Sequence, residues 1–282
     1  MAGRGLPDRG RGGLAVGMFR IISDLHLFDA RTQVRDLRQI APLLAGVQTF
    51  VLNGDTCEMR AGVTPAQLAE LRAFFTASVP EVVFITGNHD PDISDVHEIL
   101  AARDRVWILH GDVCLPGLTP WSRKADGIQL RLERHLAAEP DADWSRLDVR
   151  FRIARVVARE ETYFPDRTTR SWRAHVAWIW DTLFPPLQVI AMLRSWRDLP
   201  GLAAELAQAQ RPTAQVVVTG HVHFPGVWHP ASGPVVVNTG SFFRPLGGNL
   251  VDVYADRVEV RTIVCRGGSF HPGPLLATIP LH

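Results

Sequence analysis

Short apolar runs recur along the chain, and most of them lack the alternation of apolar and polar residues that a half-exposed strand shows. Four such runs lie before residue 112 and two more follow residue 213. Continuous runs of this length are typical of strands that are covered on both faces. We therefore expect buried strands at residues 19–22, 49–52, 82–85, 106–109, 216–218 and 235–237.

Apolar residues at helical spacing separate the first runs. They predict helices over 34–44 and, after the capping box Thr64-Pro65-Ala66-Gln67, a second one; a third and shorter helix is expected to begin at Ser94. Strands that alternate with helices indicate βαβ units, whose parallel strands end at one edge of a sheet. The last two runs, 250–254 and 258–263, are predicted to be antiparallel and half exposed.

The stretch from 115 to 212 interrupts this pattern with helical periodicity and many prolines. We expect it to be an inserted helical cap between core segments 18–114 and 213–282, after a disordered tail at 1–17 that is rich in glycine and arginine. Helices are predicted at 128–136, 147–158, 172–183, 187–196 and 202–209. Within the cap, five of the chain's eight tryptophans lie between residues 144 and 196, and they either pack a small helical core or line a hydrophobic groove: Trp144, Trp172, Trp178, Trp180 and Trp196.

Composition narrows the class of protein. The 282 residues are 46% hydrophobic, which is ample for a large core, and the net charge of +1 gives no global attraction to nucleic acid or membranes. Three cysteines and no apolar run of transmembrane length predict a soluble, cytoplasmic protein. Arginine outnumbers lysine throughout the chain, so a cluster of arginines is weak evidence of a binding site. We therefore interpret Arg152, Arg155 and Arg159, which share one predicted helix face, as a solvated face in preference to a phosphate-binding clamp.

Residues that can ligate a metal follow nearly every predicted core strand. Each of these short stretches fits an ordinary turn when it is taken alone, but their joint occurrence in order at strand ends is what indicates a site. The residues are Asp24, His26, Asp55, Asn88, His89, Asp90, His110, His221 and His223.

This ordered set resembles the calcineurin-like metallophosphoesterase superfamily. The resemblance rests on Asp24-x-His26, Gly54-Asp55, Gly87-Asn88-His89-Asp90, His110, Gly220-His221-x-His223 and the late turn Asn238-Thr239-Gly240-Ser241. It implies a four-layer α/β/β/α sandwich with a dinuclear metal site. By resemblance, one ion would be held by Asp24, His26 and His223, the other by Asn88, His110 and His221, with Asp55 bridging the two.

The chemistry of these side chains agrees with that implication. A bridging carboxylate holds two like-charged ions roughly 3.5–4 Å apart, where they can clamp a phosphoryl group and activate a water as nucleophile. Imidazole, carboxylate and amide donors suit two divalent ions, manganese first and iron or zinc as alternatives. His89 and Asp90 are expected to be catalytic, and His89 is expected to face the phosphate of a small phosphorylated substrate.

Three other readings stay open. The opening Ile22-Ser23-Asp24-Leu25-His26-Leu27 and the helical insertion also resemble UDP-2,3-diacylglucosamine diphosphatases, which would imply a lipid-linked substrate and peripheral membrane contact through the cap; that group usually has arginine where this chain has His89. The fold could instead serve as a binding scaffold without catalysis. A nuclease is the third reading, which the near-neutral charge weakens, and we expect no stable binding of nucleic acid.

Overall fold

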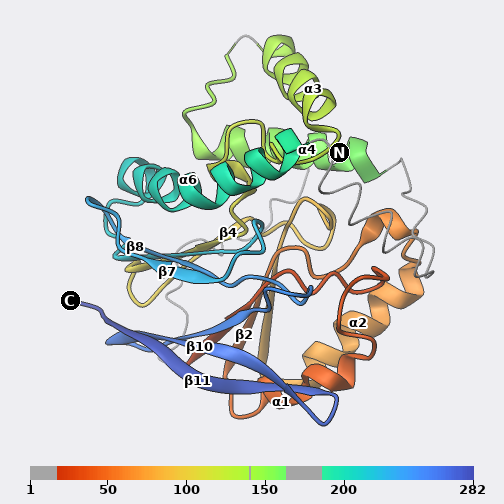
Figure 1. Ribbon diagram of the computed structural model, residues 1–282, viewed down its shortest axis with the longest axis vertical. Coiled ribbons are helices and arrows are strands. Elements are labelled where there is room, and N and C mark those ends of the chain that lie inside the picture. The colour runs from red at the N-terminus through yellow and green to blue at the C-terminus, as the bar shows by residue number, and fades with distance from the viewer. Residues whose placement is uncertain (1–17, 140, 163–185) are drawn as a thin grey trace, which may run out of the picture.

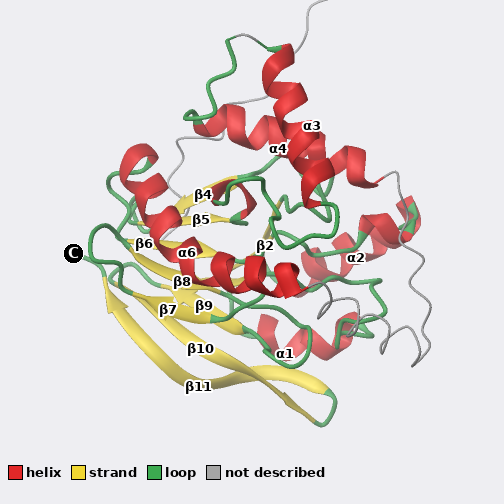
Figure 2. Ribbon diagram, turned by 45° about the horizontal axis from the view of Figure 1, so that its top comes forward, coloured by secondary structure: helices red, strands yellow, loops and turns green. Residues whose placement is uncertain are grey.

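Two β-sheets pack face to face, and helices cover the outer side of each sheet (Figure 1; Figure 2). The computed structural model describes residues 18–139, 141–162 and 186–282. The strand order is β11-β10-β9-β1-β2-β3 in the first sheet and β4-β5-β6-β8-β7 in the second. The layers are therefore α/β/β/α, and the predicted sandwich is confirmed.

The first sheet joins an N-terminal parallel part to a C-terminal antiparallel part. β1, β2 and β3 run parallel, and β9 pairs antiparallel with β1, followed outward by β10 and β11. Its strands are β1 (Phe19–Ile22), β2 (Thr49–Asn53), β3 (Glu81–Ile85), β9 (Asn249–Val253), β10 (Arg257–Arg266) and β11 (Ser269–Pro280).

The second sheet has a parallel centre between two antiparallel edges. β5, β6 and β8 run parallel, whereas β4 and β7 pair antiparallel with β5 and β8. Its strands are β4 (Glu98–Ala101), β5 (Val106–Leu109), β6 (Val216–Thr219), β7 (Gly226–Trp228) and β8 (Val235–Asn238).

The layer between the sheets is filled by branched aliphatic side chains. Ile21, Val51 and Ile85 of the first sheet join Ile108 and Val218 of the second in one fully buried cluster. Burying a side chain of this size contributes roughly 1.5–3 kcal/mol. Since the opposite faces of the same strands are covered by helices, the apolar runs are continuous.

Two helices and a 3-10 turn cover the first sheet. They are η1 (Leu37–Ile40), α1 (Ala41–Leu44) and α2 (Pro65–Ser78). α2 begins at the predicted capping box, in which the Thr64 hydroxyl accepts the Gln67 N–H at 3.3 Å and the Gln67 side chain accepts the Thr64 N–H at 2.9 Å. Leu71 and Phe75 of α2 are buried against Phe50 of the sheet.

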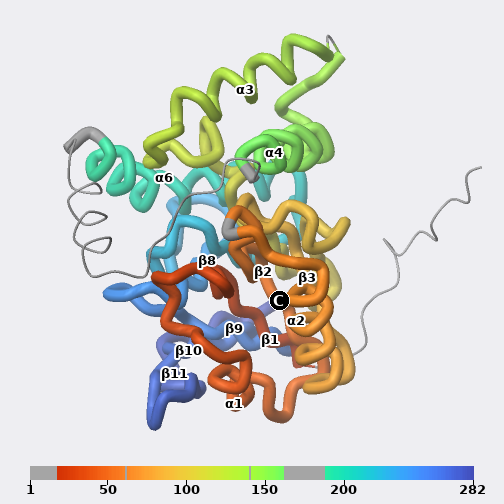
Figure 3. The backbone as a smooth tube through the Cα atoms, turned by 90° about the vertical axis from the view of Figure 1, so that its right-hand side faces the viewer, coloured from red at the N-terminus to blue at the C-terminus, as the bar shows by residue number. Residues whose placement is uncertain are grey.

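Helices of the insertion cover the second sheet, as Figure 1 and Figure 3 show. α4 (Leu147–Thr162) and α6 (Pro186–Gln210) lie next to the sheet, and α3 (Ala125–Ala138) packs on α4 farther from the sheet. Ile153 of α4 and Leu199 of α6 share one buried cluster with Trp107 and Val217 of the sheet. The described part of the insertion thus forms the fourth layer of the sandwich and shares its core with the second sheet. Its boundaries at 115 and 212 stay a prediction.

The five tryptophans between residues 144 and 196 divide between this cluster and segments outside the described residues. Trp144 and Trp196 pack on the cluster, which favours a core role for both. Trp172, Trp178 and Trp180, the predicted helix 172–183 and the tail 1–17 lie outside the described residues. None of the helices in the described part of the chain is long and apolar enough to cross a bilayer.

The helix predicted from Ser94 is wrong. Ile99 and Leu100 of that segment belong to β4 instead, in which Glu98 pairs with Leu109 of β5. A short apolar run does not distinguish helix from strand by period alone, and pairing with β5 decided the outcome. β5 itself belongs to the second sheet, so only three of the first four strands form one parallel set.

Three further predictions need correction. The helix over 34–44 is a 3-10 turn that continues into the single turn α1. α6 passes through Pro200 without the predicted break, because buried Leu199 and Ala203 on either side pack against the second sheet. β9 is buried on both faces and not half exposed, since it lies between β1 and β10 inside the first sheet.

Candidate metal centre

The turns after the strands have an unusual backbone at the candidate ligands. Five of the seven predicted ligands have positive φ: 52° at Asp24, 45° at His26, 51° at Asp55, 71° at His221 and 57° at His223. A non-glycine residue in this region costs roughly 1 kcal/mol or more. The strain turns residues at i and i+2 toward the same point, so that both members of the Asp24/His26 and His221/His223 pairs reach the centre.

All seven predicted ligands meet at the edge between the two sheets. Ligand atoms of Asp24, His26, Asp55 and His223 lie within 4.8 Å of one another, and so do those of Asp55, His110 and His221. Asn88 completes the second group, with its Oδ1 atom 3.3 Å from Nε2 of His110. Asp55 belongs to both groups, which is the place that a bridging ligand requires.

One oxygen atom of Asp55 faces both groups. Its Oδ2 lies 3.7 Å from Nε2 of His26 and 3.4 Å from Nε2 of His110. The other oxygen, Oδ1, accepts the backbone N–H of His89 at 2.8 Å. The hydrogen bond holds the carboxylate in place and leaves Oδ2 for the centre.

Main-chain carbonyl groups orient two histidines of the second group. Nδ1 of His110 donates to the Asn53 carbonyl at 3.0 Å, so Nε2 is the ring nitrogen that faces Asp55 and Asn88 and is available to an ion once its proton is lost. Nε2 of His221 donates to the Leu118 carbonyl at 2.9 Å, which leaves its Nδ1 for the centre. Such second contacts fix the tautomer that metal binding needs.

Glycines in two of the motifs permit the close approach of these turns. A Cβ atom on Gly87 would overlap the carboxylate and backbone nitrogen of Asp55, and one on Gly220 would overlap the Asp24 carboxylate and Ser23. The glycines are therefore part of the site's packing, and their place next to Asn88 and His221 has a steric reason.

The late turn predicted from Asn238 supports the first group from behind. Asn238 donates through Nδ2 to the Gly220 carbonyl at 2.5 Å, and the hydroxyl groups of Thr239 and Ser23 lie 2.5 Å apart. Ser23 in turn donates to the Asp24 carboxylate, which also accepts the His221 N–H at 3.1 Å. The turn therefore orients Asp24 and supplies no ligand itself.

His89 lies on the exposed side of the centre and pairs with a residue that we did not predict. Its Nδ1 is 2.5 Å from a carboxylate oxygen of Glu58, and its Nε2 is 3.9 Å from Oδ2 of Asp55. The His89 side chain is 21% exposed, against 1% for Asp55. Glu58 thus holds the ring so that Nε2 faces the shared oxygen and the solvent.

Asp90, which we had also expected to be catalytic, lies behind the centre. Its carboxylate accepts the backbone N–H groups of Asp55 at 3.0 Å, Thr56 at 2.7 Å and Gly87 at 2.9 Å, and the side chain is fully buried. This geometry joins the turn after β2 to the turn after β3. It is the geometry of a positioning residue.

Burial and mutual charge set the protonation of the site. Burial opposes the charged forms of Asp55 and His110, but their attraction prevails: the pKa of Asp55 falls well below its usual value and the pKa of His110 rises well above 6.5. Burial and the nearby charge of His110 lower the pKa of His221 to about 3. Burial also lowers the pKa of His89, although Glu58 acts against it.

The donor set fits two divalent ions. Nε2 of His26 and Nε2 of His223 lie 3.1 Å apart, and the latter lies 3.1 Å from Oδ1 of Asp24. Converging imidazole nitrogens and carboxylate oxygens, held by contacts on their far sides, form a set suited to manganese, iron or zinc. Asp24, His26 and His223 would hold one ion, Asn88, His110 and His221 the other, with Asp55 between them.

Sequence reasoning missed several residues around the ligands. Glu58 follows Asp55 by three residues, but a lone glutamate in a turn is usually exposed and was passed over. Phe243 stacks on His26 with ring centroids 4.7 Å apart, and Trp121 lies 5.0 Å from the His221 ring. Neither aromatic residue belongs to a motif, so only the fold brings it to the site.

Comparison with known proteins supplies the family. No curated protein matches the chain. One similar solved structure is Vps29 from Entamoeba histolytica complexed with zinc, which is 12% identical over 94% of this chain and 99% of that chain, with a TM-score of 0.42. A dimetal phosphatase from Danio rerio is 14% identical over 95% of this chain and 99% of that chain, with a TM-score of 0.43. A predicted phosphoesterase from Streptococcus pneumoniae is 12% identical over 95% of this chain and 99% of that chain, with a TM-score of 0.39. A family model described as calcineurin-like phosphoesterase matches residues 18–225. This match spans more than half of the chain and includes all seven candidate ligands, so the chain belongs to the calcineurin-like phosphoesterase family.

Proposed function

We propose that the protein is a metal-dependent phosphoesterase that hydrolyses a phosphate ester or anhydride at a dinuclear centre. The observation that carries the proposal is the position of Oδ2 of Asp55, which faces His26 at 3.7 Å and His110 at 3.4 Å and so joins two complete ligand sets. When bound, two divalent ions would supply a water of lowered pKa and neutralise charge on the phosphoryl oxygens.

The chain's own residues account for the remaining chemistry. His89 would transfer a proton through Nε2 to the leaving oxygen at the open side of the centre. Its Nδ1 donates to Glu58 at 2.5 Å, and the Glu58 charge acts against burial by favouring the doubly protonated ring that this step requires. Glu58 orients the ring, and Asp90 holds the turns that carry Asp55 and His89. We assign Asp90 a positioning role, because none of its contacts is to the open side.

A reducing compartment such as the cytoplasm is part of the proposal. The three cysteines are free, and Cys57 and Cys114 are buried. Burial raises the pKa of the Cys57 thiol well above its usual value, and the charges of Asp90 and Glu58 act in the same direction. Free cysteines and a buried, protonated Cys57 thiol both fit a protein without structural disulfides.

The test is a hydrolysis panel on protein loaded with manganese. The substrates are para-nitrophenyl phosphate as a monoester, bis-para-nitrophenyl phosphate as a diester and UDP-2,3-diacylglucosamine as a lipid-linked pyrophosphate. We expect turnover of at least one, its loss on chelation and its return with added metal. Asp55→Asn protein purified in parallel excludes a contaminating phosphatase.

The alternatives have their own outcomes in the same experiment. Turnover of the lipid-linked pyrophosphate alone would place the substrate among lipid precursors. Absence of all turnover by protein with two bound ions would contradict the proposal and favour a scaffold. Salt-dependent binding and cleavage of single-stranded DNA would indicate a nuclease.

A further inference from the structure

Three arginines on one face of α4 have different partners. Arg152 pairs with Glu139 inside the insertion at 2.5 Å, and its side chain is 48% exposed. Arg155 is only 17% exposed and reaches out of the insertion, as does Arg159. The prediction of a solvated face therefore holds for Arg152 but is wrong for Arg155, whose side chain is largely buried.

Arg155 and Arg159 both bind the short loop that follows Asp90. Nη1 of Arg155 donates to Oδ1 of Asp95 at 2.8 Å, and its Nη2 donates to the Ser94 carbonyl at 3.0 Å. Arg159 donates through Nε to Oδ1 of Asp92 at 2.8 Å. Residues 91–95, the anchored loop, are thus joined to the inserted helix by charged hydrogen bonds at both ends.

The anchored loop continues directly from the turn that carries Asn88 and His89. The Thr86 N–H donates to the Val96 carbonyl at 2.9 Å, which closes residues 86–96 into one loop, and the Ile93 N–H donates to the Asp90 carbonyl at 3.0 Å. Because the segment is closed, an anchor at its far end constrains the turn at its near end.

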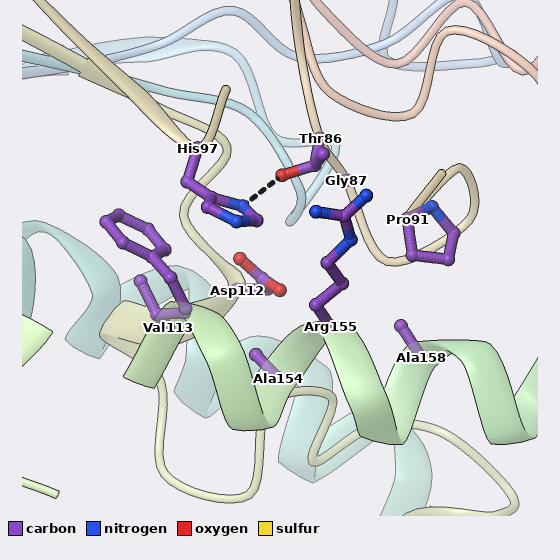
Figure 4. Close-up of a pocket in the computed structure, with 10 residues that line it drawn as sticks. Thr86, Gly87, Pro91, His97, Asp112, Val113, Ala154, Arg155 and Ala158 are labelled. Carbon is purple, nitrogen blue, oxygen red and sulfur yellow. Dashed lines mark hydrogen bonds between the residues drawn. The ribbon is translucent and has the colours of Figure 1, made fainter. Parts of the chain in front are cut away.

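A small cavity lies between α4 and this closed loop (Figure 4). Its volume of about 20 Å³ admits one water molecule. Arg155 points from α4 toward Thr86 and Gly87, with Asp112 and His97 beside it. Nε of Arg155 is buried without a hydrogen-bond partner, so a water in the cavity would have a donor in that N–H and an acceptor in the Asp112 carboxylate.

We propose that Arg155 is a positioning residue through which the inserted helix α4 holds the turn of Asn88 and His89 against Asp55. Its effect on the reaction rate rests on the proposed function, whereas its effect on the order of loop 86–96 does not. An arginine that only stabilised the insertion would leave that loop unchanged.

The test compares Arg155→Ala with Arg152→Ala, which removes an ion pair from the same helix without touching the loop. Hydrogen exchange on the metal-free protein is expected to speed up about tenfold in residues 86–96 for Arg155→Ala and to stay unchanged for Arg152→Ala. In the hydrolysis assay, Arg155→Ala should lower kcat about tenfold with little change in KM, and Arg155→Lys should recover part of the loss.

Equal exchange of loop 86–96 in Arg155→Ala and Arg152→Ala would overturn the proposal. Asp95→Asn removes the same ion pair from a side chain that is 86% exposed, so it serves if Arg155→Ala unfolds, and it should speed up exchange in the same segment. If the wild-type protein hydrolyses nothing, the proposed function fails while the exchange experiment still decides the role of Arg155.

Discussion

The two halves of the candidate metal centre have similar candidate ligands but differ in their access to solvent. In the open half, with Asp24 and His26, the His223 side chain is 29% exposed. In the enclosed half, with Asn88 and His110, His221 is 3% exposed. The difference shows that the residues packed around the candidate ligands, and not the ligands themselves, decide how far solvent reaches each half.

The insertion supplies the enclosure. The Leu118 carbonyl accepts from His221 and the Trp121 ring packs on it, and both residues lie at the start of the insertion. On the open half, Phe243 packs on His26 and His223 and leaves an exposed edge. Since His89 is also partly exposed, substrate would approach from the side of His223 and His89.

The largest effect is expected where the two halves meet. Asp55→Asn removes the charge that Oδ2 presents to both groups, so both ions should be lost and activity should fall at least about a hundredfold. Metal analysis and assay of the same preparation measure it. Retention of both ions would show that the halves do not depend on a shared ligand.

The next largest effect is expected from His89 on the open side, where a substitution should change the reaction rate without changing the metal content. His89→Ala should lower the rate about a hundredfold or more and leave the metal content unchanged, because Nδ1 of His89 is bound to Glu58 and the ring is not one of the seven proposed ligands, although His26, Glu58 and His89 also lie close enough together to hold an ion. Glu58→Gln should give a smaller loss, about tenfold. A parallel loss of metal and rate in His89→Ala would assign His89 to the metal sites.

Chelation should distinguish the halves by rate. We expect metal to leave in two phases, with the open half at least about tenfold faster because His223 is reachable by solvent and His221 is buried. Stopped-flow absorbance with a chromogenic chelator measures this. His223→Asn should abolish the fast phase and spare the slow one; a single phase in the wild-type protein would contradict the comparison.

The smallest effect concerns how the free energy of unfolding depends on pH through His97, which lies near the enclosed half. Burial, with the positive charge of Arg155, lowers the pKa of His97 to about 4 from 6.5. Protonation therefore favours the unfolded chain, and the stability that the neutral ring contributes is complete above pH 6.5 and lost as the pH falls toward 4. After allowance for partial exposure, the loss is about 1 kcal/mol.

Thermal unfolding across this range provides the measurement. His97→Gln should flatten the decline in stability between pH 6.5 and 4 relative to the wild-type protein. His229→Gln, at an exposed histidine, is the control and should follow the wild-type curve. Identical slopes for His97→Gln and His229→Gln would show that His97 does not titrate with unfolding.

The parts that sequence reasoning predicted are those specified by local pattern. Continuous apolar runs predicted the buried strands, because both faces of strands such as β2 and β6 are covered. The convergence of the candidate ligands was predictable because each follows a strand end, as Asp55 follows β2. Thr64 and Gln67 predicted the start of α2 by the same local logic.

The parts that it missed depend on contacts between distant segments. β4 formed a strand because β5 pairs with it, and α6 continues through Pro200 because Leu199 is buried against the second sheet. Glu58 and Trp121 belong to the site only because the fold carries them next to His89 and His221. No local pattern contains that information.

The central claim is that Asp55 bridges two ions, and anomalous diffraction from crystals of the manganese-loaded protein tests it directly. We expect two peaks roughly 3.5–4 Å apart on either side of the Asp55 carboxylate, one near Asp24 and His223 and the other near His110 and His221. A single peak, or two peaks that do not share Asp55, would contradict it.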